Sequence, residues 1–378
     1  MKTEISSLEL HFLLKELEPL AGGKIEQIYQ VGKEEFVLQL HITGLGKRIV
    51  RIILGKIMYV ASHKGEMPEK PPGFCLYLRK KLKNARLRSV SQLGFERIVE
   101  FVFETKEAQF KLVVELFSKG NIILCNGDGV ILSVLEAQEW KDRIVKPKEL
   151  YKYPKKDFDF LQMSESDFSA MLDKSDKESL VKSLAIDLGL GGIYAEELCS
   201  MSGVDKKIKP NQLTDKEKQS IYSSSREMIG KAISPVVIFE DAEKAVVKDV
   251  VPFMLDAYKT LLSNTYQSIN ESLDVVFTEK LDKTAIDSAV KASKTKADKI
   301  RMMVSQQTMR MEGLEKAEKE NQRKAELIYE NYMLVSPILS EINSIRKTIS
   351  WEEIKKRFKD HKIIKDINEK TGEITVEL

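Results

Sequence analysis

The residues best suited to chemistry are basic side chains gathered in one short window. Seven of them fall where the only acid is Glu96: Arg79, Lys80, Lys81, Lys83, Arg86, Arg88 and Arg97. Guanidinium and ammonium groups at this density can bind phosphate oxygens, which supplies affinity without reading base sequence. If the window is helical, Arg79, Lys83 and Arg86 share one face and apolar neighbours take the other. An ordinary solvated helix face explains the same charges.

A short glycine-rich turn is the second candidate for phosphate binding. Gly189, Gly191 and Gly192 stand in the string GLGG between two short helical patterns. Backbone N–H groups of a tight turn and of a helix N-terminus can point at a phosphate. A plain connection between two helices accounts for the same residues, so both interpretations stay open.

No set of residues typical of an enzyme active site emerges. The chain lacks the strings GxxxxGK(S/T), GxSxG and HExxH, which mark phosphate-binding, hydrolase and zinc-protease sites. The histidines are scattered, and Cys75, Cys125 and Cys199 lie far apart without a CxxC or Cys/His spacing. We therefore expect no catalytic residue, no cofactor and no bound metal.

Length and composition indicate several folded units without a large overall charge. Of 378 residues, 42% are hydrophobic and 31% are charged, which excludes wholesale disorder and a disulfide scaffold. The formal net charge is only +3, so binding to a nucleic acid must come from local clusters. Charged residues interrupt the N-terminal segment, and no stretch reaches the apolar length of a membrane span. We expect a cytoplasmic chain without a membrane partner.

The first part of the chain, residues 1–172, predicts a sheet-rich α+β domain. Leu10, Leu13, Leu14 and Leu17 recur at helical spacing and predict an opening helix. Runs of alternating apolar residues follow, separated by turns that contain glycine, and they predict successive antiparallel hairpins. A second short helix is expected over the basic window, so the strands on either side must position it.

The rest of the chain is predicted to be mainly helical. The patterns around the GLGG turn predict a helix-hairpin-helix domain over residues 173–255, with one more hairpin near its end. Apolar residues that alternate spacings of three and four predict a coiled-coil arm over 256–348. Pro337 is expected to bend or interrupt this arm. A small unit that ends in a hairpin is expected over 349–378.

Several strings, taken in order, resemble the NFACT family, which includes the RqcH and NEMF group and was formerly described as fibronectin-binding. The strings are PPGFCLYLRKKLKNARL, QLGFERIVEFVFE, VVELFSKGNIIL, the Asp142-Arg143 pair and the element from Tyr151 to Pro154. Farther on, ELIYENYMLV and SWEEI resemble the coiled coil and middle region of that family. The resemblance covers essentially the whole chain and makes residues 349–378 the start of the middle region.

The resemblance implies a non-catalytic, ribosome-associated quality-control factor. Such proteins bind large ribosomal subunits obstructed with peptidyl-tRNA and recruit tRNA for C-terminal tailing of the stalled nascent chain. The family's Asp-Arg pair, implicated in tRNA engagement, falls on Glu96 and Arg97 here, and Arg97 keeps the guanidinium that grips phosphate. A second family motif matches Glu115, Leu116 and Phe117, and an RNA-binding role is expected for Glu115, Lys119 and Asn121.

Two other functions remain as alternatives. The first domain of the family also resembles the N-terminal fold of formamidopyrimidine-DNA glycosylases, whose nucleophile is an N-terminal proline amine. This chain begins Met1, Lys2, Thr3, Glu4, so a DNA-repair enzyme lacks its nucleophile here. A fibronectin-binding adhesin, the older family description, is opposed by the charged N-terminal segment, which is no signal peptide.

The family has a second coiled-coil helix and a C-terminal RNA-binding domain beyond the middle region, whereas this sequence stops at Leu378. We therefore interpret the chain as an N-terminal fragment, with a naturally short homologue as the alternative. The apolar seam of the arm then lacks its partner helix, which predicts a homodimer through residues 297–345. Three polar seam residues, Gln307, Glu318 and Asn321, are expected to keep this pairing modest.

Overall fold

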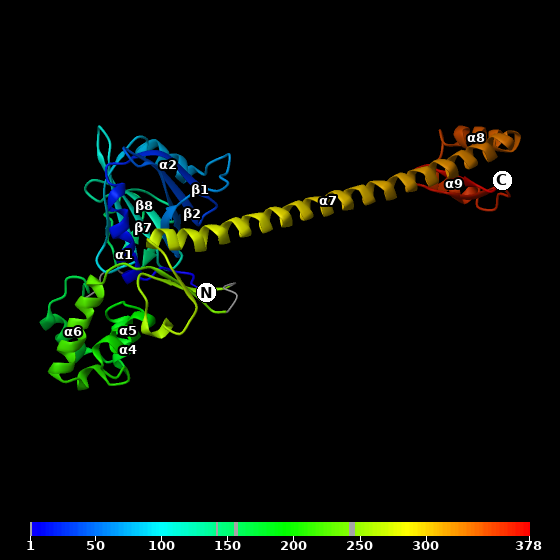
Figure 1. Cartoon of the computed structure of the whole chain (residues 1–378). Helices are drawn as coiled ribbons and strands as arrows, with labels where there is room; N and C mark the ends of the chain where they lie inside the picture. The colour runs from blue at the N-terminus through cyan, green and yellow to red at the C-terminus, as the bar shows by residue number, and fades with distance from the viewer. Residues whose placement is uncertain (1, 141–142, 155–157, 242–245) are drawn as a thin grey trace. The chain divides into compact units, whose positions relative to one another are not determined.

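The computed structural model describes most of the chain, namely residues 2–140, 143–154, 158–241 and 246–378, with the backbone alone for 279–296. The chain divides into two compact units, Met1–Ala285 and Ile286–Leu378. Each unit combines helices with antiparallel strands, which confirms the predicted α+β class (Figure 1).

A large antiparallel sheet dominates the first unit, with the strand order β4-β3-β2-β1-β5-β6-β7-β8-β9. Two meanders therefore meet where β1 lies beside β5. The first meander contains β1 (Lys24–Val31), β2 (Glu35–Ile42), β3 (Gly46–Ile53) and β4 (Ile57–Ala61). The second contains β5 (Arg86–Gln92), β6 (Ile98–Glu104), β7 (Gln109–Glu115), β8 (Asn121–Asn126) and β9 (Ile131–Val134). The hairpins predicted from the alternating pattern are confirmed.

Two helices contact this sheet, the first at β5 and the second at β1. α1 (Ser7–Leu17) begins with a capping box, in which Ser6 Oγ accepts from the Glu9 N–H and the Glu9 carboxylate accepts from the Ser6 N–H. The leucines that predicted this helix are buried in the main core, and the short η1 (Glu18–Leu20) follows it. α2 (Gly73–Leu82) lies against β1 (Figure 1). These contacts fix the start of the basic window on the sheet.

The turn after β3 touches the turn before β8. Gly55 and Gly120 both adopt left-handed backbone conformations, with φ of +68° and +72°. A Cβ placed on Gly120 would lie 2.2 Å from Gly55 N, closer than any real carbon can approach. The two meanders are therefore joined directly at this backbone contact, which only glycine permits.

Replacing Gly120 by alanine is expected to lower the free energy of unfolding by about 2 kcal/mol, because the new Cβ meets backbone and the left-handed φ is strained. Gly129→Ala is the matched control. Gly129 has φ +86°, but its Cβ would make only an ordinary contact at 3.5 Å, so we expect a loss of about 1 kcal/mol. Urea unfolding compares the two variants, and equal losses would contradict the importance of the Gly55 contact.

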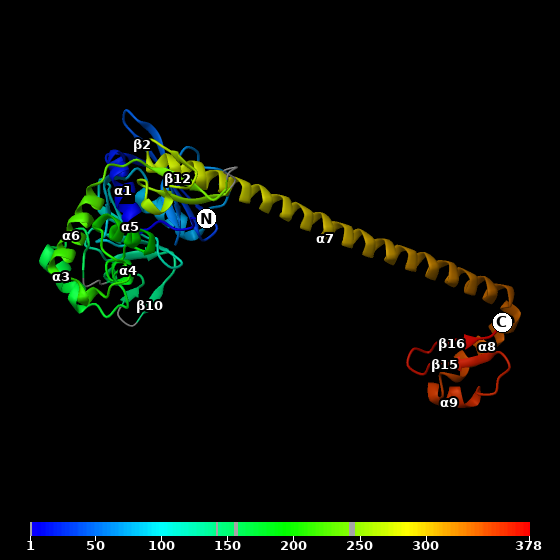
Figure 2. The same cartoon turned by 60° about the horizontal axis from the view of Figure 1, so that its bottom comes forward.

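A short ribbon and a group of helices follow the sheet. The ribbon pairs β10 (Gln138–Trp140) with β11 (Arg143–Val145). The helices, which lie together in Figure 2, are α3 (Glu165–Lys174), α4 (Leu180–Ile186), α5 (Gly192–Ser202), η2 (Pro210–Gln212) and α6 (Asp215–Gly230). α4 and α5 flank the GLGG turn as predicted. α3 runs across residue 172, where a domain boundary was expected.

The first unit also contains a three-stranded sheet, whose strands are β12 (Val236–Phe239), β13 (Val247–Val251) and β14 (Ser263–Thr265). The pairing of β12 with β13 confirms the predicted late hairpin.

The predicted helical arm needs a correction at its start. Residues 256–265 contain η3 (Asp256–Tyr258) and β14, because pairing with β12 holds this segment extended. α7 (Ile269–Glu330) begins only afterwards, with Ser268 Oγ accepting from the Glu271 N–H at 3.0 Å.

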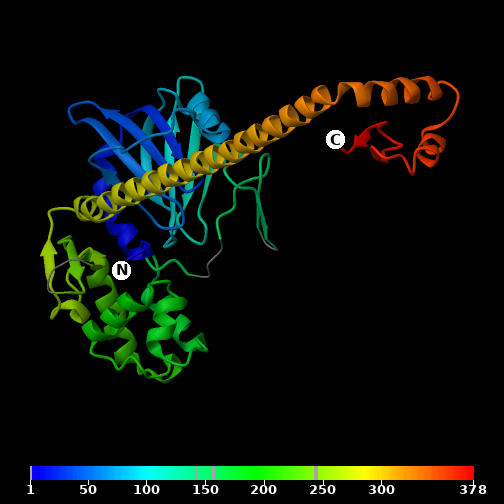
Figure 3. The same cartoon turned by 90° about the vertical axis from the view of Figure 1, so that its right-hand side faces the viewer.

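The second unit, taken by itself, is built on the end of α7. It adds α8 (Tyr332–Ile345), α9 (Trp351–Arg357), β15 (Ile364–Ile367) and β16 (Ile374–Val376), coloured orange to red in Figure 3. The predicted terminal hairpin is confirmed by the pairing of β15 with β16. No helix in the described part of the chain has the length and apolar character needed to span a membrane.

Pro337 was expected to bend or interrupt the arm, and it does not interrupt the helix. The helix breaks at Asn331, where φ is −100° and ψ is 23°, and Pro337 lies inside α8. Ile338 and Ile342 are buried in the core of the second unit, and this packing keeps α8 helical on both sides of the proline. Val335 of the predicted seam is buried as well, whereas Tyr332 and Leu339 of the same seam are exposed.

Candidate nucleic-acid interface

The basic window does not form one helix, so the predicted helical ridge is wrong. α2 ends before Lys83, Asn84 takes a left-handed φ of 59°, and the carbonyl of buried Ala85 accepts a hydrogen bond from β1. Arg86 then begins β5. The pairing of β1 with this segment draws it into the sheet, so Arg79, Lys83 and Arg86 lie on different elements.

Most of the basic window instead lines one cavity of about 1040 Å³, which we call the basic groove. Its lining residues are Lys24, Lys80, Lys81, Lys83, Asn84, Arg86, Arg88, Glu104, Thr105, Lys106, Glu107 and Phe110. Seven of these side chains are cationic and two are carboxylates. Such an excess in a concave surface attracts phosphate groups.

Only part of the charge in the basic groove is neutralised. Arg88 forms an ion pair with Glu104, and Arg86 Nη1 donates to the Gly22 carbonyl at 2.9 Å. Within the described residues, Lys80, Lys81 and Lys83 have no carboxylate partner, and Lys80 and Lys83 are exposed. Their ammonium groups are free to contact an anion.

Sequence reasoning missed two cationic residues of the basic groove, Lys24 and Lys106. Lys24 is opposite Arg86 in the β1–β5 pair, and Arg86 is opposite Glu104 in the β5–β6 pair. Lys106 follows β6 in the turn to β7. The sheet therefore gathers these residues from separate parts of the sequence, and no local signal marked them.

Arg79 does not line the basic groove. Its Nε donates to the Ile28 carbonyl at 2.6 Å, and its guanidinium lies over the Tyr29 ring at 5.4 Å from the centroid. These contacts tie α2 to β1. Arg79 therefore holds α2, which carries Lys80 and Lys81 of the basic groove, against β1. Its own guanidinium does not face the groove.

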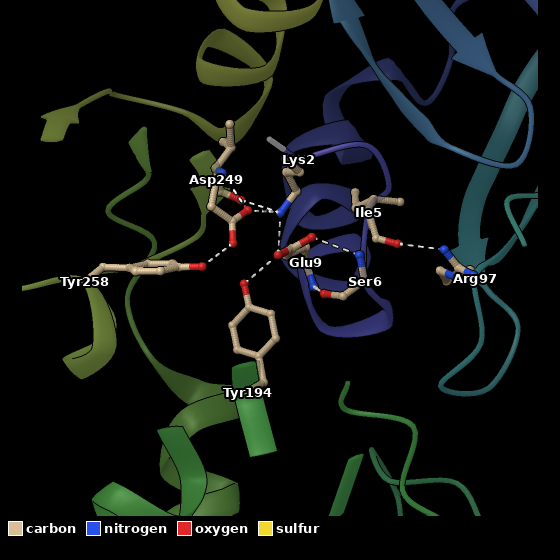
Figure 4. Close-up of polar contacts among 9 residues, drawn as sticks. Lys2, Ile5, Ser6, Glu9, Arg97, Tyr194, Asp249 and Tyr258 are labelled. Carbon is tan, nitrogen blue, oxygen red and sulfur yellow. Dashed lines mark hydrogen bonds and ion pairs between the residues drawn. The ribbon is translucent and has the colours of Figure 1, made fainter. Parts of the chain in front are cut away.

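Glu96 and Arg97 lie at the turn between β5 and β6, apart from the basic groove. Arg97 Nη1 lies 2.5 Å from Glu4 Oε2, and a quarter of the Arg97 side chain is exposed. The same atom lies 3.5 Å from the Ile5 carbonyl (Figure 4). Glu96 is half-buried, and its carbonyl accepts from Gln92 Nε2. The N-terminal segment thus holds Arg97 in place while leaving part of its guanidinium accessible.

A second cavity, of about 350 Å³, places Lys119 near this arrangement. Glu4, the partner of Arg97, lines it together with Lys33, Lys56 and exposed Lys119. The predicted RNA-binding residues Arg97 and Lys119 therefore converge on the same part of the molecule, although they come from different turns.

Glu115 and Asn121 are buried, so their expected direct contacts with RNA need correction. Glu115 is 2% exposed, and its carboxylate pairs with Arg143 and accepts from the Tyr151 hydroxyl. The fully buried Asn121 donates to the Glu136 carbonyl at 2.9 Å. Both side chains bond within the chain and hold neighbouring loops. Asp142, the other half of the expected pair with Arg143, lies outside the described residues.

The GLGG turn connects α4 to α5, and the Gly191 N–H donates to the Ala185 carbonyl at 3.2 Å. Gly189 and Gly191 have φ of 74° and 76°, and Gly191 is the N-cap of α5. A Cβ at Gly191 or Gly192 would meet no heavy atom within 4 Å, so the turn is open. Phosphate binding by this turn stays a prediction.

Among the described residues, no group of three or more His, Cys, Asp or Glu side chains is placed to hold a metal ion. The cationic surfaces described above have the charge and exposure needed for electrostatic binding of a polyanion.

Two curated relatives match this sequence over all or nearly all of its length. An archaeal Rqc2 homologue, aRqcH of Methanocaldococcus jannaschii, is 31% identical over 100% of this chain and 58% of its own length. The human ribosome quality control complex subunit NEMF is 25% identical over 94% of this chain and 35% of its own length. This chain therefore spans less than two thirds of these relatives.

A solved structure supports the same fold. The N-terminal part of the fibronectin/fibrinogen-binding protein of Streptococcus suis matches with a TM-score of 0.59 and 20% identity, over 73% of this chain and 100% of that one. At this identity the likeness shows the fold alone. The family model for NFACT N-terminal and middle domains matches residues 6–371. With nearly the full length matched, this chain belongs to the NFACT family.

Proposed function

We propose that this chain is a non-catalytic RNA-binding factor of ribosome quality control. It binds large ribosomal subunits obstructed with peptidyl-tRNA and recruits tRNA for C-terminal tailing of the stalled chain, in the cytoplasm and without a cofactor. The match of residues 6–371 to the NFACT model carries the proposal, because relatives across that length are named as ribosome quality control subunits.

The basic groove supports this proposal by supplying phosphate contacts. Lys80, Lys81 and Lys83 offer ammonium groups that bind phosphates of any sequence. Arg97, Lys119 and the GLGG turn extend the RNA surface. A protein that binds folded RNA through the sugar-phosphate backbone of the RNA needs phosphate contacts more than it needs contacts with base edges.

Sedimentation with isolated large ribosomal subunits tests the proposal. The chain is expected to comigrate with large subunits that carry peptidyl-tRNA, and to comigrate less with empty large subunits or with complete ribosomes. Binding to none of the three, or equal binding to all of them, would contradict it.

Arg97→Ala is expected to weaken tRNA binding about tenfold, because one charge-assisted contact contributes about 1.5 kcal/mol. The thermal midpoint should change little, since Arg97 pairs with the half-exposed Glu4. Fluorescence anisotropy with labelled tRNA measures the affinity, and Glu4→Gln is the control that removes the ion pair but keeps the guanidinium. An unchanged affinity with a lower thermal midpoint would make Arg97 structural.

The exposed part of the α7 seam is expected to pair with a second copy of the chain. Ile300, Met311 and Leu314 are each about 60% exposed or more, and they share the coiled-coil spacing. Sedimentation over a wide concentration range should show a dimer that Leu314→Glu abolishes. Glu315→Gln, one position away from the seam, is the control. A strictly monomeric chain at all concentrations would rule out the homodimer.

A further inference from the structure

An arginine in contact with two aromatic rings stands on the β10–β11 ribbon, outside the basic groove. Trp140 and Arg143 are opposite each other in this ribbon. The guanidinium carbon of Arg143 lies 5.3 Å from the Trp140 ring centroid and 5.1 Å from the Tyr151 ring centroid. Both distances are in the range of cation–π contacts. One guanidinium thus supports both rings.

Buried hydrogen bonds hold this guanidinium in place. Arg143 pairs with the Glu115 carboxylate, and its Nε donates to the Lys152 carbonyl. The Tyr151 hydroxyl donates to the same Glu115 oxygen at 2.9 Å. Burial, together with the nearby Glu115 carboxylate, raises the pKa of Tyr151, so this hydroxyl stays a donor. A planar group with fixed partners presents Trp140 in a preorganised position.

The surface of this cluster carries exposed aromatic rings and charges of both signs, because Glu139 and Glu149 are exposed beside Trp140 and Lys148. Trp140 is 47% exposed and Tyr153 is 55% exposed, although large aromatic side chains are usually mostly buried. Lys148 and Lys152 are exposed on the same segment. Exposed aromatic rings beside cations are the features by which proteins hold unpaired bases of a nucleic acid strand.

We propose that Trp140 is a stacking platform for an unpaired base of single-stranded RNA, with Lys148 and Lys152 contacting the adjacent phosphates. The lysines favour a polyanion over an uncharged protein surface. Glu115 acts as a positioning residue, because its carboxylate fixes Arg143 beneath the tryptophan. The inference rests on the proposed RNA-binding function, but it does not depend on the basic groove.

Tryptophan fluorescence tests the stacking directly. The chain has two tryptophans, so Trp351→Phe leaves Trp140 as the only one. Titration of this variant with a single-stranded RNA hexamer is expected to quench the fluorescence to saturation. The same hexamer in a duplex should quench it far less, because its bases are already stacked. No quenching by single-stranded RNA that binds the chain would overturn the proposal.

Affinity measurements separate stacking from phosphate contacts. Trp140→Ala is expected to weaken binding of the single strand about tenfold, with an unchanged slope of log affinity against log salt. Trp140→Tyr should keep most of the affinity, and Leu45→Ala, 45% exposed on another turn, should keep all of it.

Three results would overturn the stacking proposal, and they differ in what else they affect. If Trp140→Ala binds single-stranded RNA as tightly as the unaltered chain, Trp140 is not a stacking platform, and the proposed function is unaffected. If the Trp140 fluorescence changes on addition of RNA-free ribosomal proteins but not on addition of RNA, this surface binds a protein partner. A chain that binds no RNA of any kind overturns the platform and the proposed function together.

Discussion

Replacing both Lys80 and Lys81 by glutamate is expected to lower the affinity for tRNA about a hundredfold. Both lysines line the basic groove, and within the described residues neither has a carboxylate partner. Loss of two charge-assisted contacts at about 1.5 kcal/mol each gives this change. The slope of log affinity against log salt should become shallower by about 2, because each lysine neutralises about one phosphate. Anisotropy titrations at several salt concentrations measure both quantities.

The control for this variant is the same charge reversal elsewhere on the chain. Lys316 and Lys319 are exposed on α7, outside the basic groove, and glutamate at both positions changes the net charge equally. We expect the control to bind tRNA nearly as well as the parent. If it loses as much affinity as the Lys80 and Lys81 variant, overall charge and not the basic groove governs binding.

Lys2→Met is expected to lower the free energy of unfolding by about 4 kcal/mol. Lys2 Nζ lies 2.6 Å from Glu9 Oε1 and 2.7 Å from Asp249 Oδ1, and its side chain is only 6% exposed (Figure 4). Removing one partner from a buried ion pair leaves the remaining charge uncompensated, which costs about 3–5 kcal/mol. Urea unfolding of the parent and the variant measures the difference.

Two tyrosines extend this buried cluster across the first unit. Tyr194 on α5 donates to Glu9 at 2.7 Å, and Tyr258 on η3 donates to Asp249 at 2.8 Å (Figure 4). A variant that combines Lys2→Met with Glu9→Gln and Asp249→Asn should regain part of the lost stability, because no unpaired charge remains. A Lys2→Met variant as stable as the parent would contradict the role of the ammonium.

The pH dependence of this stabilisation follows from the pKa of Lys2. Burial lowers that pKa, but the Glu9 and Asp249 carboxylates outweigh the burial and raise it above 10.5. A raised lysine pKa stabilises the fold fully below 10.5, and the effect is lost only as the pH rises above that value. The stability difference between parent and Lys2→Met should therefore be constant between about pH 7 and about pH 9.

Local patterns in the sequence were sufficient to predict the helices and hairpins that bury one face. The leucine spacing of α1 and the alternation in β1–β9 show which side chains of each element face the core. Each pattern repeats within a few residues, so it can be recognised without knowing which distant segments the element contacts. The prediction of a basic ridge on one helix is wrong because Ala85 hydrogen-bonds with β1, which lies more than fifty residues earlier in the chain. This pairing places the segment in the sheet.

The functional surfaces depend on contacts that a sequence does not display. Lys24, Arg86 and Glu104 are neighbours only because β1, β5 and β6 pair side by side. The buried cluster of Lys2 and Asp249 likewise joins residues from opposite ends of the first unit. The basic window could be recognised from its density of charge, whereas these partners could not.

Sequencing the RNA that copurifies with the chain tests the central claim, that the basic groove binds RNA of the obstructed large subunit. The parent is expected to retain tRNA and large-subunit ribosomal RNA in clear excess over an acidic control protein. The Lys80→Glu, Lys81→Glu variant is expected to lose both, while the Lys316→Glu, Lys319→Glu control keeps them. The same amount and kinds of RNA on the parent and on the Lys80 and Lys81 variant would contradict the claim.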